Sequence, residues 1–212
     1  MIRELWMHNS SVKMTKLLLL TIAIVTTLTM VLPANIIGHV WADDIEGTDG
    51  DDFLEGTDGD DNIDSRDGSD FNFGDSLFDD GSGDDNIGSG DGDDANFGDT
   101  AGGVGSGDDN IDSGDGDDIN SGDTVIGDGS GDDKIKSGKG NDQNFGDTQS
   151  GVGSGEDTIN AGQGDDQLTG NGGADKFQCG SGTDEVTDFN TDEGDKATGN
   201  CENIDKGNKN KK

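Results

Sequence analysis

The chain lacks several residue types on which most catalytic and binding sites depend. It contains no tyrosine, and both histidines and both tryptophans fall within the N-terminal segment 1–42. The segment 43–212 therefore offers no imidazole for a zinc site and no Trp or Tyr ring to stack against a sugar. Basic residues are scarce as well, with 13 Lys and Arg against 48 Asp and Glu and a formal net charge of −35. Because no basic patch exists outside the short tail 206–212, we expect no nucleic-acid partner.

The sequence motifs of several enzyme classes are also absent. Neither H-E-x-x-H nor G-x-S-x-G occurs, and acidic repeats begin within a few residues of position 43, which leaves no sequence for a catalytic domain. Counting does not exclude paired carboxylates of the glycosidase type, because aspartate is abundant, yet a core one side chain thick offers no pocket. We therefore expect no enzymatic activity. The segment 188–192 reads like the start of an EF-hand calcium loop. An EF-hand is excluded there, because Glu193 occupies the position that requires glycine.

The N-terminal segment 1–42 differs in composition from the rest of the chain. Three basic residues precede the apolar run 17–31, and the tripeptide Val-Trp-Ala at 40–42 fits a signal-peptide cleavage site. The pattern predicts a secretory signal peptide over 1–42 with a hydrophobic leader helix. Because the apolar stretch is longer than a minimal signal, an uncleaved N-terminal anchor is the alternative. Both interpretations place the acidic remainder outside the cell, secreted or associated with the cell surface.

The remainder of the chain has a fixed period. Large apolar residues recur at equal intervals, each led by Gly-x-Asp-x, at Ile63, Ile87, Ile111, Ile135 and Ile159. Steps of nine residues continue the series at Leu168, Phe177 and Val186 and reach back to Leu54. Two successive units read GTDGDDFLE (47–55) and GTDGDDNID (56–64). A fixed period with regularly placed glycines predicts a solenoid in which each unit stacks on the next.

Elementary chemistry assigns a role to each position of the nine-residue unit. The early glycines let the backbone take positive φ and turn its carbonyl oxygens toward a common point. The aspartate at the sixth position enters a three-residue strand with its carboxylate at that point, and the apolar eighth residue faces inward, because side chains alternate across a strand. Carbonyl and carboxylate oxygens suit Ca²⁺, which takes six to eight oxygen ligands.

The unit resembles the RTX, or hemolysin-type calcium-binding, nonapeptide GGxGxDxUx, where U is a large apolar residue. Thirteen frames cover about 47–187, with departures at position one and with asparagine at position eight in alternate frames. The resemblance implies an all-β fold, a parallel β-roll (β-solenoid) with short strands and calcium-binding turns, preceded here by the leader helix. It also implies Ca²⁺ as the bound ion. We expect a monomer.

In the RTX family the sixth-position aspartates bind calcium between successive turns, together with carbonyls at positions two and four. The aspartates that take this role here are Asp52, Asp61, Asp70, Asp85, Asp94, Asp109, Asp118, Asp133, Asp142, Asp157, Asp166, Asp175 and Asp184. The fourth-position glycines assigned as carbonyl ligands are Gly50, Gly59, Gly83, Gly92, Gly107, Gly116, Gly131, Gly140, Gly155 and Gly164.

The asparagines at position eight recur at the same interval as the isoleucines, at Asn72, Asn96, Asn120 and Asn144, and each is followed by Phe or Ser and then Gly-Asp. Each full repeat is thus two nonapeptides plus a six-residue insert, at 74–79, 98–103, 122–127 and 146–151. We expect the inserts to stack into a ridge along one edge. Two interpretations are open: the ridge is a binding surface, or an asparagine ladder and a phenylalanine stripe simply fill a wider turn.

The composition and the two cysteines complete the predicted organisation. We divide the chain into the signal peptide or anchor 1–42, the repeat solenoid 43–187, and a C-terminal cap with a basic disordered tail, 188–212. Cys179 and Cys201 flank the end of the repeats, and in an exported chain a disulfide closing a loop of about 22 residues is expected; two unpaired thiols are the alternative.

High charge and few apolar residues would leave the chain unfolded without ions, so that ion binding becomes part of the folding free energy. We expect a calcium-folded structural or adhesive module that contacts a cell-surface or matrix component. A calcium sink without a specific partner and a disordered acidic polymer that binds cations or mineral loosely are the alternatives.

Overall fold

The computed structural model describes residues 44–205. The predicted signal peptide with its leader helix and the basic tail 206–212 lie outside the described residues. Within 44–205 every regular element is a short strand, and no helix there is long and apolar enough to cross a membrane. The strands form parallel sheets, which confirms the prediction of an all-β parallel roll.

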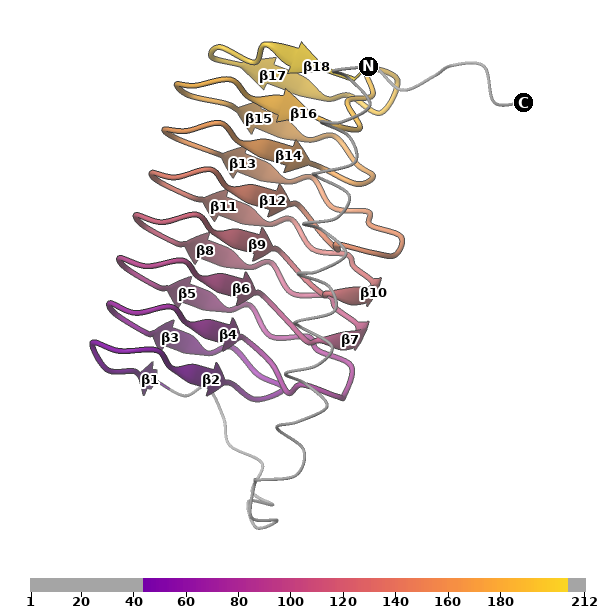
Figure 1. Cartoon of the computed structure of the whole chain (residues 1–212). Helices are drawn as coiled ribbons and strands as arrows, with labels where there is room; N and C mark the ends of the chain where they lie inside the picture. Colours follow the sequence, from indigo (N-terminus) through magenta and orange to yellow (C-terminus); the bar gives the residue numbers. More distant parts are fainter. Residues whose placement is uncertain (1–43, 206–212) are drawn as a thin grey trace, which may run out of the picture. The chain divides into compact units, whose positions relative to one another are not determined.

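Two eight-stranded parallel sheets make up the roll, and the chain alternates between them, so that each coil adds one strand to each sheet (Figure 1). The first sheet consists of β1 (Asp44–Glu46), β3 (Asn62–Asp64), β5 (Asn86–Gly88), β8 (Asn110–Asp112), β11 (Lys134–Lys136), β13 (Thr158–Asn160), β15 (Lys176–Gln178) and β17 (Lys196–Thr198). The second consists of β2 (Phe53–Glu55), β4 (Phe71–Phe73), β6 (Ala95–Phe97), β9 (Ile119–Ser121), β12 (Gln143–Phe145), β14 (Gln167–Thr169), β16 (Glu185–Val186) and β18 (Asn203–Ile204).

The eighth residue of each unit faces the core, as predicted. In the first sheet Ile63 pairs with Ile87, Ile87 with Ile111, and the column continues through Ile135 and Ile159. All five isoleucines are buried. Each sheet therefore contributes a single layer of side chains to the core between the sheets. A three-residue strand with one inward side chain allows no more.

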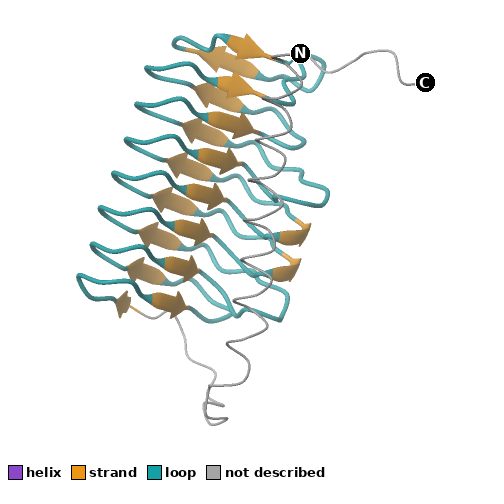
Figure 2. Cartoon of the chain, viewed as in Figure 1, coloured by secondary structure: helices purple, strands orange, loops and turns teal. Residues whose placement is uncertain are grey.

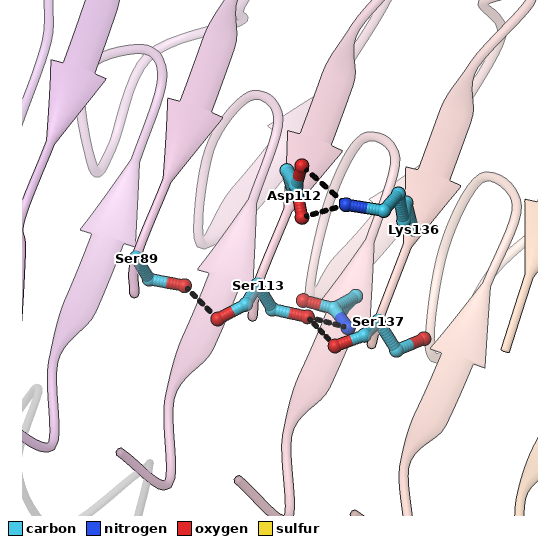
Figure 3. Close-up of polar contacts among 6 residues, drawn as sticks. Ser89, Asp112, Ser113, Lys136 and Ser137 are labelled. Carbon is cyan, nitrogen blue, oxygen red and sulfur yellow. Dashed lines mark hydrogen bonds and ion pairs between the residues drawn. The ribbon is translucent and has the colours of Figure 1, made fainter. Parts of the chain in front are cut away.

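The inward column of the second sheet is polar in its middle. Asn72, Asn96, Asn120 and Asn144 are fully buried and form a ladder, in which the Nδ2 of each of the first three donates to the Oδ1 of the next at 2.8–3.0 Å. Hydroxyl groups line the same core: Ser89 Oγ donates to the carbonyl of Ser113 at 3.2 Å, and Ser113 Oγ to that of Ser137 at 3.3 Å (Figure 3). These bonds lower the cost of burying the amides. The predicted asparagine ladder is thus present.

The turns at the two edges of the roll differ in length, and they carry nearly all of the irregular chain (Figure 2). Along one edge the turns have six residues, as in 65–70 and 89–94. Along the other edge four turns have twelve residues: 74–85, 98–109, 122–133 and 146–157. We call this second side the insert edge. There β7 (Gly102–Val104) pairs in parallel with β10 (Ile126–Asp128), so the inserts stack on one another as expected.

The C-terminal segment closes both sheets. β17 pairs with β15, and β18 pairs with β16. Asp195 Oδ1 accepts a hydrogen bond from the amide of Asp175 at 3.1 Å, and Glu202 Oε2 accepts one from Asp184 at 3.2 Å. The expected disulfide between Cys179 and Cys201 is present, with Cα atoms 5.3 Å apart. It ties the end of the repeats to the segment that carries these two carboxylates.

Breaking the disulfide should make folding require more calcium. Closing a loop of this length stabilises by about 3 kcal/mol, and in a repeat array a loosened end weakens every neighbouring interface in turn. If about ten ions bind cooperatively as the chain folds, the loss is about 0.3 kcal/mol for each ion. The calcium concentration at the midpoint of folding should therefore rise roughly 1.5- to 2-fold. The measurement is a calcium titration of the Cys201→Ser variant, followed by circular dichroism. An unchanged midpoint would contradict a stabilising role for the bond.

Candidate metal centres

The sixth-position aspartates form two rows, one along each edge of the roll. In both rows Oδ1 of one aspartate accepts a hydrogen bond from the backbone amide of the aspartate one coil earlier. Asp109 Oδ1 accepts from Asp85 at 2.7 Å on the insert edge, and Asp118 Oδ1 accepts from Asp94 at 2.9 Å on the other. The insert edge carries Asp61, Asp85, Asp109, Asp133, Asp157 and Asp175, and the short-turn edge carries Asp52, Asp70, Asp94, Asp118, Asp142, Asp166 and Asp184.

The second carboxylate oxygen of most of these aspartates is buried without a hydrogen-bond partner among the described residues. The Oδ2 atoms concerned belong to Asp70, Asp85, Asp94, Asp109, Asp118, Asp133, Asp142, Asp157, Asp166 and Asp184. A buried carboxylate oxygen without a donor or a cation is strongly unfavourable. Ten such oxygens in two regular rows fit ligands of a hard cation bound between the coils, and Ca²⁺ is the ion that such oxygens suit.

Backbone oxygens lie in matching rows. A Cβ added at Gly116 would collide with the carbonyl oxygen of Gly92 one coil earlier, and a Cβ at Gly131 would collide with that of Gly107. Only glycine at position four therefore lets the carbonyls of successive turns come this close. The predicted glycines lie at these places, and so do three that the sequence assignment omitted: Gly68, Gly173 and Gly182.

The first coil is an exception in both rows. Oδ2 of Asp52 accepts hydrogen bonds from the amide (2.5 Å) and hydroxyl (2.9 Å) of Thr48. Oδ2 of Asp61 accepts the same pair from Thr57, at 2.5 and 3.0 Å. A threonine thus occupies the second oxygen of each first aspartate, whereas ten of the eleven later aspartates leave that oxygen buried without a donor. The structure therefore separates Asp52 and Asp61 from the ten aspartates with an unpaired Oδ2.

Comparison with known families shows which repeat family has this pattern. A family model described as the RTX calcium-binding nonapeptide repeat matches the chain in four copies, over residues 42–71, 120–150 and 152–186. The chain carries RTX calcium-binding nonapeptide repeats. Between the matched segments, Asp85, Asp94, Asp109 and Asp118 keep the same period and the same hydrogen bonds, so the RTX pattern is structurally continuous. No curated protein and no solved structure matches the chain significantly.

Four further aspartates lie at the insert edge of the RTX roll, outside the nonapeptide frame. Asp75, Asp99, Asp123 and Asp147 are fully buried, and each has at least one carboxylate oxygen without a hydrogen-bond partner. The nonapeptide frame does not identify them as ligands. The signal for them was the Gly-Asp pair that opens each insert and recurs once in every full repeat.

Burial and like charge disfavour ionisation of these carboxylates. Burial, reinforced by the neighbouring carboxylate of Asp75, raises the pKa of Asp85 to about 8. Burial and the neighbouring Asp147 raise the pKa of Asp157 to about 9. On the short-turn edge, where the burial is less deep, burial raises the pKa of Asp94 only to about 6. Each row therefore needs positive charge, from protons or from a metal ion, and the insert edge needs it more.

Without calcium, the stability of the RTX roll should fall as the pH rises. An aspartate whose pKa rises from 3.8 to about 8 on folding holds its proton more tightly in the roll than in the unfolded chain. The proton-linked stabilisation is thus complete below about pH 4 and is lost as the pH rises through the folded pKa values. We expect calcium-depleted protein to show more β-structure at pH 4.5 than at pH 7.5 by circular dichroism.

The control for this experiment is light scattering, because the isoelectric point is about 4.1 and aggregation near it must be excluded. If the β-content of the soluble, calcium-depleted chain instead rose with pH, the buried carboxylates would not limit folding in the way described.

Proposed function

We propose that the protein is an exported calcium-binding β-roll that folds when Ca²⁺ fills its turns and then serves as a structural or adhesive module at a cell surface or in a matrix. The observation that carries the proposal is the series of ten buried Oδ2 atoms without a hydrogen-bond partner. A disordered polyanion needs acidity but no register, whereas these oxygens recur coil by coil at fixed positions. Register therefore favours ordered ion binding over loose binding of cations or mineral.

Export is supported by the disulfide and by the weak sites that the family implies. Disulfides persist in oxidising compartments outside the cytoplasm. Calcium outside cells reaches the concentrations that fill low-affinity oxygen sites. Together with the leader predicted over 1–42, these features support an extracellular place of action.

The adhesive part of the proposal rests on the insert edge. The exposed large apolar residues of the described chain are Phe78, Val104, Ile126 and Val152, with exposed fractions of 47–69%. All four lie in inserts or next to them, and the two strands β7 and β10 order this ridge. Exposed apolar side chains gathered on one edge of a strongly acidic surface are typical of a contact site. This favours the binding-surface interpretation of the inserts without removing the filling role of the asparagine ladder.

A surface-binding assay tests this proposal. Fluorescently labelled 43–212 should bind intact cells or matrix of the source in millimolar calcium, and binding should fall several-fold when Phe78, Ile126 and Val152 are replaced by serine. The calcium-dependent circular dichroism of the variant serves as the folding control. Equal binding by the two proteins, or equal binding in chelator, would contradict the adhesive role.

A further inference from the structure

Along the insert edge, buried aspartates gather in three groups that each combine two insert aspartates with one sixth-position aspartate. In every group one carboxylate oxygen of each member lies within 4.8 Å of those of the other two. The groups are Asp75, Asp85 and Asp99; Asp99, Asp109 and Asp123; and Asp123, Asp133 and Asp147. Asp99 and Asp123 each belong to two successive groups.

The carboxylate oxygens in these groups lack the partners that buried acids require. Neither oxygen of Asp99 and neither oxygen of Asp123 has a hydrogen-bond partner, although both residues are fully buried. Asp75 Oδ1 and Asp147 Oδ2 are unpaired as well, while the other oxygen of each accepts backbone amides of its own turn. The sixth-position members add their unpaired Oδ2 atoms. Every member of the three groups thus brings at least one buried carboxylate oxygen without a donor.

The twelve-residue turn explains how two carboxylates per coil come together. A Cβ at Gly105 would meet the Cβ of Asp123 at 2.7 Å and would also collide with Asp99 Oδ2, so glycine there allows the returning chain to pack over both aspartates.

The row of insert aspartates ends where the inserts end. At the C-terminal side Asn171 follows the turn's first glycine, and its Oδ1 accepts the amide of Thr148 at 3.2 Å. At the N-terminal side the corresponding residue is Thr57.

We propose that the insert edge holds a row of three calcium sites that the nonapeptide frame alone does not form, in which two insert aspartates join one sixth-position aspartate and Asp99 and Asp123 are each shared by two successive ions. Ca²⁺ binds oxygens at 2.3–2.6 Å, so two ligands of one ion lie up to roughly 5 Å apart, and oxygens that lie within 4.8 Å of one another meet this limit. When ionised, the seven aspartates carry seven negative charges, and three divalent ions supply six positive ones. This inference rests on the proposed calcium-dependent fold.

Counting bound calcium in variants of the 43–212 chain tests the sharing directly. By native mass spectrometry at saturating calcium, Asp75→Asn should lose one ion, Asp99→Asn two, and the Asp99→Asn, Asp123→Asn double variant three. Asp79→Asn removes the same charge from an exposed position of the same insert and should lose none. Equal losses in the Asp75 and Asp99 variants would overturn the shared row.

A second measurement uses the unaltered chain and so does not depend on whether a variant folds. Anomalous scattering from crystals grown in calcium should show three peaks between Asp75 and Asp147, in line along the insert edge. A folded, calcium-loaded protein without these peaks would overturn the inference alone. A chain that calcium does not fold would overturn the inference and the proposed function together.

Discussion

Removing calcium from the 43–212 chain should convert its far-UV circular dichroism from that of β-structure to that of a coil, and returning calcium should restore it cooperatively. Each strand turns one side chain into the core between the two sheets, and in the middle of the second sheet that side chain is an asparagine, to which the neighbouring Phe73 and Phe97 add a little buried apolar surface. This small core opposes the repulsion of two rows of carboxylates, most of which carry an unpaired buried oxygen. The free energy of ion binding must therefore supply much of the folding free energy.

Magnesium should not replace calcium in this experiment. Mg²⁺ demands near-octahedral geometry at 2.0–2.1 Å and gives up its water reluctantly, whereas Ca²⁺ accepts six to eight oxygens in flexible arrangements. Chelator with excess Mg²⁺ should leave the spectrum of a coil. A β-rich spectrum that chelator does not change would show that the two sheets are stable without ions.

The second large effect is expected from Asp109→Asn. Asp109 is buried in the middle of the roll, where its Oδ1 accepts the amide of Asp85 and its Oδ2 has no partner. Asparagine keeps the size and one acceptor oxygen, but its NH₂ group then takes the place of the unpaired oxygen. A donor would face the cation, and one negative charge would be lost. We expect weaker calcium binding and faster amide exchange around Ile87 and Ile135.

Asp112→Asn is the matched control, three residues along the chain. The side chain of Asp112 lies on the outer face of β8, is 52% exposed, and forms an ion pair with Lys136 at 2.7 Å (Figure 3). An exposed pair of this kind contributes at most about 1 kcal/mol, so this variant should bind calcium almost as the parent does. Equal shifts of the calcium midpoint in the two variants would reduce the role of Asp109 to bulk electrostatics.

The period of the sequence was sufficient to predict the roll and the inward column. Each isoleucine from Ile63 to Ile159 lies where the nine-residue frame places it, because strand alternation leaves one inward position in three. The frame also located the carboxylate rows, since the sixth residue always precedes a strand by one. It did not distinguish the first coil, where Thr48 and Thr57 occupy the aspartate oxygens by local hydrogen bonds.

The insert aspartates show where such prediction ends. Asp75 precedes Asp85 by ten residues, and no fixed backbone geometry links two residues at that distance in a turn. Their approach depends on how the twelve-residue turn folds back, with the next coil supplying Asp99. The nonapeptide frame did not predict the closing carboxylates Asp195 and Glu202 either, because both lie past the last complete frame. They nevertheless extend the two rows of sixth-position aspartates.

Counting bound calcium and measuring β-structure on the same samples tests the central claim most directly. The 43–212 chain would be dialysed against a series of free calcium concentrations, with bound metal measured by atomic emission and folding by circular dichroism. We predict that the two curves coincide and that the folded chain holds about ten ions, in line with the unpaired Oδ2 atoms of the two rows, three of which belong to the insert-edge groups. Binding of many ions by a chain whose spectrum stays that of a coil would contradict the account and leave a loose acidic polymer in its place.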